Sequence, residues 1–296
     1  MKINSEIVDT PPRHAASVLM LRDAAPGLQV FMLKRHNDSA VLGGAYVFPG
    51  GKLDAEDADL GRLLDRTPSA LHASLGEPGL SPAAAAGLFV AALREAFEES
   101  GVLFASGTDG AKLAQAIAMH QQGSPFCALL TQLSLTLSTQ GVLPWSRWIT
   151  PRMPSVSRQR FDTRFFVAAV PEHQTARHDN IEATESIWLT PHDALQQYWD
   201  GRIALAPPQI MSLVHLAQHS RVSGVLDEAR QRTPPLIEPE PFNEDGARVL
   251  TYPGDPRHSV RERALPGPTR LYYRQDRFEP AGGLAALLNA GSAAAG

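Results

Sequence analysis

The sequence predicts an α/β fold, because segments patterned as β-strands alternate with an amphipathic helix and capped helices along most of its 296 residues. Residues 15–22 and 28–34 are two apolar runs separated by a turn at Pro26-Gly27, which predicts paired strands. Between 82 and 100, apolar residues recur at i, i+3 and i+4 spacing, the pattern of a helix with one buried face. Gly101 then stands where a left-handed helix cap is usual.

Further elements extend this α/β pattern toward the carboxyl end. Thr190 and Pro191 have the residue types favoured at the cap and first position of a helix. The residue pattern also predicts strands at 46–48, 148–150, 161–170, 186–189, 248–252 and 269–273. It predicts helical segments within 110–138, near 207–219 and at 222–231.

Changes in composition divide the chain into three parts. We place the main domain at 13–232, with one insertion at about 55–82, for which a surface excursion with one short helix is expected, and a helical insertion at about 107–140. A proline-rich joint leads into a β-containing extension at 233–280, expected to pack on the main domain. The Ala- and Gly-rich residues 281–296 are expected to be disordered.

Charge and cysteine usage exclude several classes of function. A net charge of -4 gives no basic surface for nucleic acid, so no nucleic-acid partner is expected. The single cysteine, Cys127, excludes an intramolecular disulfide and fits a reducing compartment. No apolar run approaches the ~20 residues of a spanning helix. We therefore expect a cytoplasmic protein without a membrane partner.

Three carboxylates lie on adjacent turns of the helix predicted at 82–100. Glu95, Glu98 and Glu99 are three and four residues apart, so they share a helix face. Such a patch repels itself unless a cation neutralises it, and Mg²⁺ prefers carboxylate and phosphate oxygens. The glutamates alone are equally compatible with a solvated helix face.

A glycine pair upstream favours the metal-site interpretation. Gly50 and Gly51 follow Phe48-Pro49 at the end of a predicted strand, and glycines allow backbone N–H groups to approach a phosphate closely.

Together these features resemble a Nudix box. Gly51 begins the motif and residues 94–102 complete it, with Ala96 at its first aliphatic position. Asp57 stands where the family has glutamate, and Arg94 follows Gly51 by 43 residues, about 29 more than in the family pattern. The resemblance implies an α/β/α sandwich with a mixed sheet.

The resemblance also implies hydrolysis of a small molecule in which a nucleoside diphosphate is linked to another moiety, with Mg²⁺ or Mn²⁺ as cofactor. Glu98 and Glu99 would bind the metal, Glu95 would bind metal or act as the base, and Arg94 would hold the glutamates by ion pairs. Backbone at Gly50 and Gly51 would complete the metal or phosphate shell. A homodimer is expected from the family's habits.

The general base and the phosphate-binding residues are less sharply indicated. Glu182 and Glu185 are candidate bases in a loop, where solvated acids are the ordinary alternative. The arginines Arg35, Arg160 and Arg164 could bind phosphate bidentately, with surface ion pairs as the alternative.

The interrupted box and the segment 160–166 are similar to a Nudix subgroup that includes the mammalian peroxisomal coenzyme A diphosphatases. That implies cleavage of coenzyme A or acyl-CoA into 3′,5′-ADP and (acyl-)4′-phosphopantetheine. A coenzyme A motif of the family is matched at Arg35 and Gly44 but departs at Leu33 and Ala40. The alternatives are an ADP-ribose or dinucleotide pyrophosphatase and, in another class, a non-catalytic nucleotide sensor or scaffold.

Overall fold

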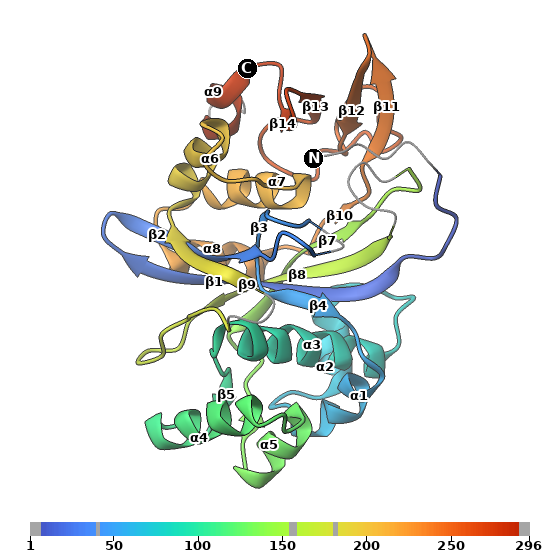
Figure 1. Ribbon diagram of the computed structural model, residues 1–296. Helices are drawn as coiled ribbons and strands as arrows, with labels where there is room; N and C mark the ends of the chain where they lie inside the picture. Colours follow the sequence, from blue (N-terminus) through green and yellow to red (C-terminus); the bar gives the residue numbers. More distant parts are fainter. Residues whose placement is uncertain (1–6, 40–41, 154–158, 180–182, 290–296) are drawn as a thin grey trace.

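The computed structural model describes residues 7–39, 42–153, 159–179 and 183–289. Its centre is a mixed eight-stranded sheet with helices on both faces (Figure 1), which confirms the predicted α/β/α architecture. The main path of the sheet runs β10 (Leu236–Ile237), β7 (Val142–Ile149), β8 (Phe161–Ala169), β1 (Arg13–Ala24), β2 (Gly27–Arg35) and β3 (Tyr46–Val47). In addition, β4 (Gly50–Lys52) pairs with β1, and β9 (Ala183–Leu189) pairs with β2.

The central strands are buried on both faces. β1 runs parallel to β8 and antiparallel to β2, so it lies between two long neighbours. Its side chains alternate between two apolar cores, with Val18 and Met20 in one and Leu19 and Leu21 in the other. This double burial explains why β1 appears in the sequence as a continuous apolar run.

One face of the sheet is covered by the helix that carries the glutamates, α3 (Pro82–Ser100). The oxygen of Ser81 accepts the N–H of Ala84 at its start, and Gly101, with φ of 71°, donates to the carbonyl of Phe97 at its end. Around α3 lie α1 (Ala55–Asp59), the 3-10 helix η1 (Leu60–Leu63), α2 (Pro68–Leu75), α4 (Gly110–Gln121), α5 (Phe126–Gln132) and the small sheet of β5 (Ala105–Ser106) and β6 (Thr136–Leu137).

The insertion predicted at about 55–82 is more ordered than expected. It holds α1, η1 and α2 rather than one short helix, and both α1 and α2 pack on α3. The insertion therefore becomes part of the helical layer that supports the glutamates.

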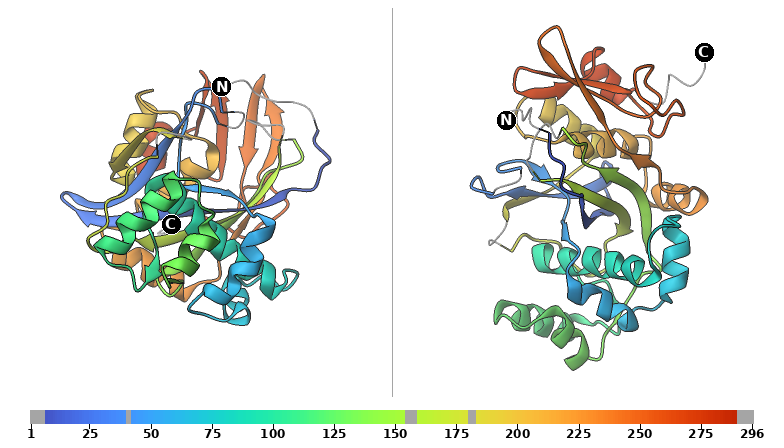
Figure 2. Two further views of the ribbon diagram at one scale, coloured as in Figure 1. Left: turned by 60° about the horizontal axis from the view of Figure 1, so that its bottom comes forward. Right: turned by 90° about the vertical axis from the view of Figure 1, so that its right-hand side faces the viewer.

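The other face carries α6 (Pro191–Trp199), α7 (Pro207–Leu216) and α8 (Val222–Gln231). Beyond them lies the C-terminal extension, which Figure 2 shows at the far side of this layer from the central sheet. The extension forms an antiparallel sheet of β11 (Glu240–Glu244), β12 (Ala247–Thr251), β13 (Arg270–Arg274) and β14 (Arg277–Glu279), followed by α9 (Gly283–Leu288).

The extension shares its apolar core with the main sheet. Leu250, Tyr252 and Leu271 belong to the same buried cluster as Trp148. The expectation that disorder begins at 281 is wrong for 283–288, because these residues form α9 and Leu287 is fully buried. Residues 290–296 lie outside the described part of the chain. Within the described residues, every helix is too short or too polar to cross a bilayer.

Candidate active site

The structure brings the glycine pair against the glutamates of α3. The N–H of Gly50 donates to Oε2 of Glu99 at 2.9 Å. A Cβ atom added to Gly51 would lie 2.2 Å from Oε1 of Glu95, closer than any real side-chain contact. A residue larger than glycine would therefore displace the carboxylate, which explains the residue type at 51 by close approach rather than by backbone conformation.

Arg94 joins three carboxylates into one network. Its Nη1 donates to Oε1 of Glu95 at 2.9 Å and to Oε2 of Glu98 at 3.0 Å. Its Nε and Nη2 donate to the two oxygens of Asp57 at 2.9 and 3.0 Å, a bidentate pair. Burial by itself would lower the pKa of Arg94, but the hydrogen bonds with Asp57 and the charges of Glu95, Asp57 and Glu98 raise the pKa above its ordinary value. Arg94 is therefore permanently charged.

The position of Asp57 follows from the local structure of the insertion. Asp57 is the third residue of α1, and its Oδ2 accepts the N–H of Asp54, the residue that caps this helix, at 2.9 Å. The Asp57 side chain is almost completely buried against Arg94. The insertion thus begins with a helix turn that supplies an ion-pair partner to the box arginine.

A cavity of about 420 Å³ opens beside Gly50, Gly51 and Glu95. Its lining is mostly apolar, and the charged side chains that contribute to it are Arg35, Lys52 and Glu95. The remaining wall comes from several elements, listed here by position: Ala15, Ala16, Ser17, Leu42, Val47, Phe48, Trp148, Ile149, Thr150, Pro151, Gln159, Phe161, Thr163, Phe165, Ala206, Pro207, Pro208, Gln209, Pro239 and Leu250.

Arg35 is the predicted phosphate ligand that reaches this cavity. Its Nε atom is buried and has no hydrogen-bond partner among the described residues. An unpaired buried donor is costly, and a phosphate oxygen is a group that would satisfy it. Lys52 adds a second cation at the same cavity.

The glutamate cluster fits a divalent cation in the chemistry of its donors. Glu95, Glu98 and Glu99 supply hard carboxylate oxygens from one helix, and Arg94 contacts one oxygen each of Glu95 and Glu98. Arg94 lies between these two carboxylates and offsets their repulsion. Among the described residues, the group whose potential ligand atoms all lie within 4.8 Å of one another is a different one, and Mg²⁺ is usually bound through one or two carboxylates together with waters and substrate phosphates.

Arg160 and Arg164 do not reach the cavity. The guanidinium of Arg164 is buried and hydrogen-bonded to Glu77 at 3.0 Å and to the carbonyl of Asp162 at 2.9 Å. Arg160 donates to the carbonyl of Thr150 at 2.9 Å and lies near Glu238. Both arginines are thus held in intramolecular contacts.

The strand period accounts for the position of Arg164. Successive residues of a strand point to opposite faces, and Phe161, Thr163 and Phe165 line the cavity. Asp162 and Arg164 must then point to the other face, where they form an ion pair at 3.0 Å.

Of the two candidate bases, Glu185 is described and Glu182 lies outside the described residues. Glu185 is half-exposed, makes a 3.5 Å ion pair with Lys34 and does not line the cavity.

The cavity also contains residues that sequence reasoning missed. Lys52 could have been identified from the sequence, since it directly follows the glycine pair. Trp148, Gln209 and Leu250 could not, because their contribution depends on how α7 and the extension fold over the sheet.

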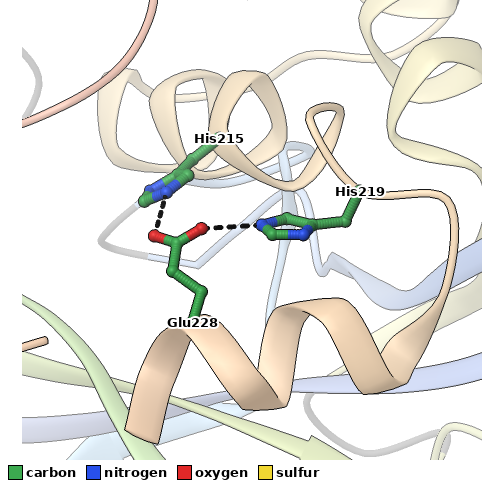
Figure 3. Close-up of side chains that lie close together, drawn as sticks. All are labelled: His215, His219 and Glu228. Atoms are coloured by element: carbon green, nitrogen blue, oxygen red, sulfur yellow. Dashed lines mark hydrogen bonds and ion pairs between the residues drawn. The ribbon is translucent and has the colours of Figure 1, made fainter. Parts of the chain in front are cut away.

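A second cluster of titratable groups lies between α7 and α8, outside the cavity (Figure 3). Nε2 of His215 and Nε2 of His219 lie 2.7 and 2.8 Å from the two oxygens of Glu228. In the described part of the chain, this is the group whose potential metal-ligating atoms all lie within 4.8 Å of one another.

Arg232 supplies the positive charge that balances Glu228 in this second cluster. Its Nε donates to Oε1 of Glu228 at 2.7 Å, and its guanidinium stacks on Trp145. Burial lowers the pKa of His215, although the hydrogen bond and charge of Glu228 oppose this shift. Burial alone would raise the pKa of Glu228, but hydrogen bonds from His215 and His219, and the charges of His215 and Arg232, bring that pKa well below its ordinary value. An arginine already balances the carboxylate, so we assign the cluster to helix packing.

Comparison with known proteins agrees with the box. The family described as "NUDT19 Nudix domain" matches residues 75–216. The chain is 27% identical over 272 residues to "Acyl-coenzyme A diphosphatase NUDT19" of Xenopus laevis, covering 77% of this chain and 70% of that protein. It is 29% identical over 267 residues to the Gallus gallus protein of the same name, covering 72% and 70%. It is 28% identical over 262 residues to "Putative nudix hydrolase 7" of Caenorhabditis elegans, covering 87% and 78%.

The fold has a counterpart among solved structures. A crystal structure of a NUDIX hydrolase from Alicyclobacillus acidocaldarius superposes with a TM-score of 0.59 and 24% sequence identity, covering 74% of this chain and 97% of that one. Sequence family, fold and the assembled box agree with one another. The chain is therefore similar to Nudix hydrolases in sequence and has their fold, and these similarities support an enzyme that hydrolyses phosphoric anhydride bonds.

Proposed function

We propose that this enzyme is a coenzyme A diphosphatase that cleaves coenzyme A or its acyl esters into 3′,5′-ADP and (acyl-)4′-phosphopantetheine. The observation that carries the proposal is the junction of two surfaces at Gly51, where the glutamates of α3 meet a large, mainly apolar cavity with cations at its wall. The names of the vertebrate relatives point to the same substrate.

The proposed roles follow from the contacts. A bound divalent cation, Mg²⁺ or Mn²⁺, supplies the positive charge that a diphosphate needs beside an acidic helix. Glu95, Glu98 and Glu99 hold that cation, together with backbone at Gly50. Arg94 keeps the carboxylates of Glu95 and Glu98 oriented through the hydrogen bonds described above.

Substrate phosphates are proposed to bind at the cationic part of the cavity. The buried Nε of Arg35 has no partner in the described part of the chain, and Lys52 lies on the strand that carries the glycine pair. Coenzyme A carries a 3′-phosphate besides its diphosphate, so each of these two cations could bind a phosphate group. Arg160 and Arg164 are left out of the proposed site, because their guanidinium groups are engaged elsewhere.

Glu182 remains our proposed general base, with Glu95 as the other candidate. Its support is positional, since Ala183 directly follows it and pairs with Arg35, which lines the cavity. A glutamate-to-glutamine change at each position, followed over pH, separates the two, because only the base contributes the acidic limb of the rate profile.

Three finer properties are part of the proposal. We propose Mg²⁺ or Mn²⁺ as the ion, a cytoplasmic location and a homodimer. The location is supported by Cys127, which is a free thiol, and the ion by the oxygen donors of the glutamates.

A substrate panel tests the proposal. Coenzyme A, an acyl-CoA, ADP-ribose and NADH are incubated separately with Mg²⁺ or Mn²⁺, and the products are identified by mass. We expect 3′,5′-ADP and the matching phosphopantetheine at the highest kcat/KM. Preferred cleavage of ADP-ribose or NADH would show that the substrate is another diphosphate rather than coenzyme A. Binding of these compounds without cleavage of any of them would indicate a sensor.

A further inference from the structure

Resting on the proposed function, we propose that the C-terminal extension is a specificity-determining wall of the active site. Pro239 and Leu250, together with Trp148, select substrates whose diphosphate carries an uncharged, extended apolar group, which makes acyl-CoA a better substrate than free coenzyme A. The extension lies beyond residues 75–216, the part of the chain that the family match covers.

The polarity of the cavity wall supports an uncharged occupant. The residues contributed by β7, β8, α7 and the extension include Trp148, Phe161, Phe165 and Leu250, and none of those residues is charged. Trp148 and Leu250 are only 4% and 3% exposed. A second nucleotide would bring phosphates and hydroxyls to this wall without matching donors, whereas a thioester chain would bury its methylenes there.

The start of α7 strengthens this inference. A helix N-terminus ordinarily binds anions through its free N–H groups. Here the first two residues are Pro207 and Pro208, which have no N–H, and both line the cavity. The helix end therefore presents apolar rings where a phosphate site would be expected.

Gln209 adds one polar group to this apolar wall. Its side-chain oxygen is buried and has no hydrogen-bond partner among the described residues. An amide N–H is the kind of ligand donor that satisfies such an oxygen, and the pantetheine arm carries amides.

The wall is tied firmly to the main sheet. Ile237 of β10 pairs in parallel with Trp148 of β7, and Pro239 follows two residues later. The rings of Trp148 and Tyr252 meet edge to face at 5.8 Å, and Leu250 pairs with Leu271 in the extension's own sheet. A wall fixed in this way can discriminate by shape, since it cannot yield without breaking sheet pairing.

The experiment compares kcat/KM for free coenzyme A, acetyl-CoA and octanoyl-CoA in the full-length protein with Mg²⁺. The variants are Leu250→Trp, which fills the cavity, and Leu250→Ala, which enlarges it. The matched control is Leu271→Ala, since Leu271 pairs with Leu250 and is buried but does not line the cavity. Circular dichroism establishes that each variant is folded.

We expect wild type to prefer octanoyl-CoA, because each buried methylene favours binding by roughly fourfold. Leu250→Trp should lower kcat/KM for octanoyl-CoA about tenfold or more, and for free coenzyme A by less than about threefold. Leu250→Ala should reduce the octanoyl preference, and Leu271→Ala should leave the preference unchanged. If Leu250→Trp does not fold, Leu250→Ala decides by itself.

Two results would overturn the inference. One is equal loss for all three substrates in the Leu250 variants, and the other is a wild-type enzyme indifferent to chain length. Both differ from failure of the proposed function, in which wild type would release no 3′,5′-ADP from any coenzyme A substrate.

Discussion

At the scale of single residues, Arg94 and Asp57 connect the box to its insertion. The arginine is part of the family motif, whereas the aspartate enters from α1, within the segment that interrupts the motif. Their bidentate contact shows how a box can tolerate about 29 extra residues, since the inserted chain begins with a turn that restores the ion pair.

Removing the Asp57 carboxylate should destabilise the protein. Asp57→Ala leaves the guanidinium of Arg94 buried without its main partner, which costs about 3 kcal/mol in free energy of unfolding. Urea unfolding measures this loss. Asp59→Ala, an exposed change in the same helix, is the matched control and should cost less than about 0.5 kcal/mol. Equal stability of the two variants would show that the Arg94–Asp57 pair does not support the fold.

Glu98 should affect turnover rather than folding. Its side chain is partly exposed beside Arg94, so Glu98→Gln removes the charge that we propose binds metal, without opening the core. We expect kcat to fall by about three orders of magnitude at saturating Mg²⁺, with an unchanged melting temperature. Glu56→Gln, an exposed glutamate in α1, is the control and should keep full activity. Near-normal kcat in Glu98→Gln would remove this residue from the metal site.

At the scale of elements, α7 and α8 are joined by the cluster of His215, His219 and Glu228 (Figure 3). The pKa shifts of His215 and Glu228 both imply that the folded state is less stable in acid. The lowered pKa of His215 means that the unfolded chain binds the proton more readily, so stability falls as pH drops below about 6.5. The lowered pKa of Glu228 gives stability above its ordinary value, about 4.5, which is lost as pH falls further.

Glu228→Gln tests this assignment. At pH 7 this substitution should lower the free energy of unfolding by about 2 kcal/mol, because charged hydrogen bonds to two histidines and Arg232 are weakened. The difference in melting temperature from wild type should narrow as pH falls from about 4.5 to 3, since protonation of Glu228 then removes the same contribution from wild type. Asp227→Asn, on the exposed side of α8, should show no such trend. A difference that stays constant with pH would contradict the assigned role.

The elements differ in how far the sequence predicts them. The helix at 82–100 was predicted at its observed bounds because its apolar spacing and the cap residue Gly101 are local signals. The helix α9 was missed because its Ala- and Gly-rich sequence carries no such signal, and burial of Leu287 by distant residues stabilises it. Helix spacing predicts that Glu95, Glu98 and Glu99 share a face, whereas the contact of Gly50 with Glu99 joins residues 49 positions apart and was expected only from the resemblance to the Nudix box. The apolar cavity wall could not be predicted, since it depends on long-range packing of Leu250.

At the scale of the whole molecule, the extension and the main sheet form one core. Leu250, Leu271 and Phe278 share an apolar cluster with residues of α6, α7 and the central strands. We therefore expect a single cooperative thermal transition, with far-ultraviolet circular dichroism and tryptophan fluorescence changing together. An early transition confined to one probe would show that the extension unfolds by itself, and it would weaken the case for a rigid cavity wall.

The central claim is that the glutamates of α3 hold a divalent cation beside the glycine pair. The most direct measurement is an anomalous difference map from crystals soaked in Mn²⁺ and coenzyme A. We predict a peak bounded by the carboxylates of Glu95, Glu98 and Glu99 near Gly50, with the diphosphate in contact with it. A map that lacks density there, or that has its only peak at His215, His219 and Glu228, would contradict the account.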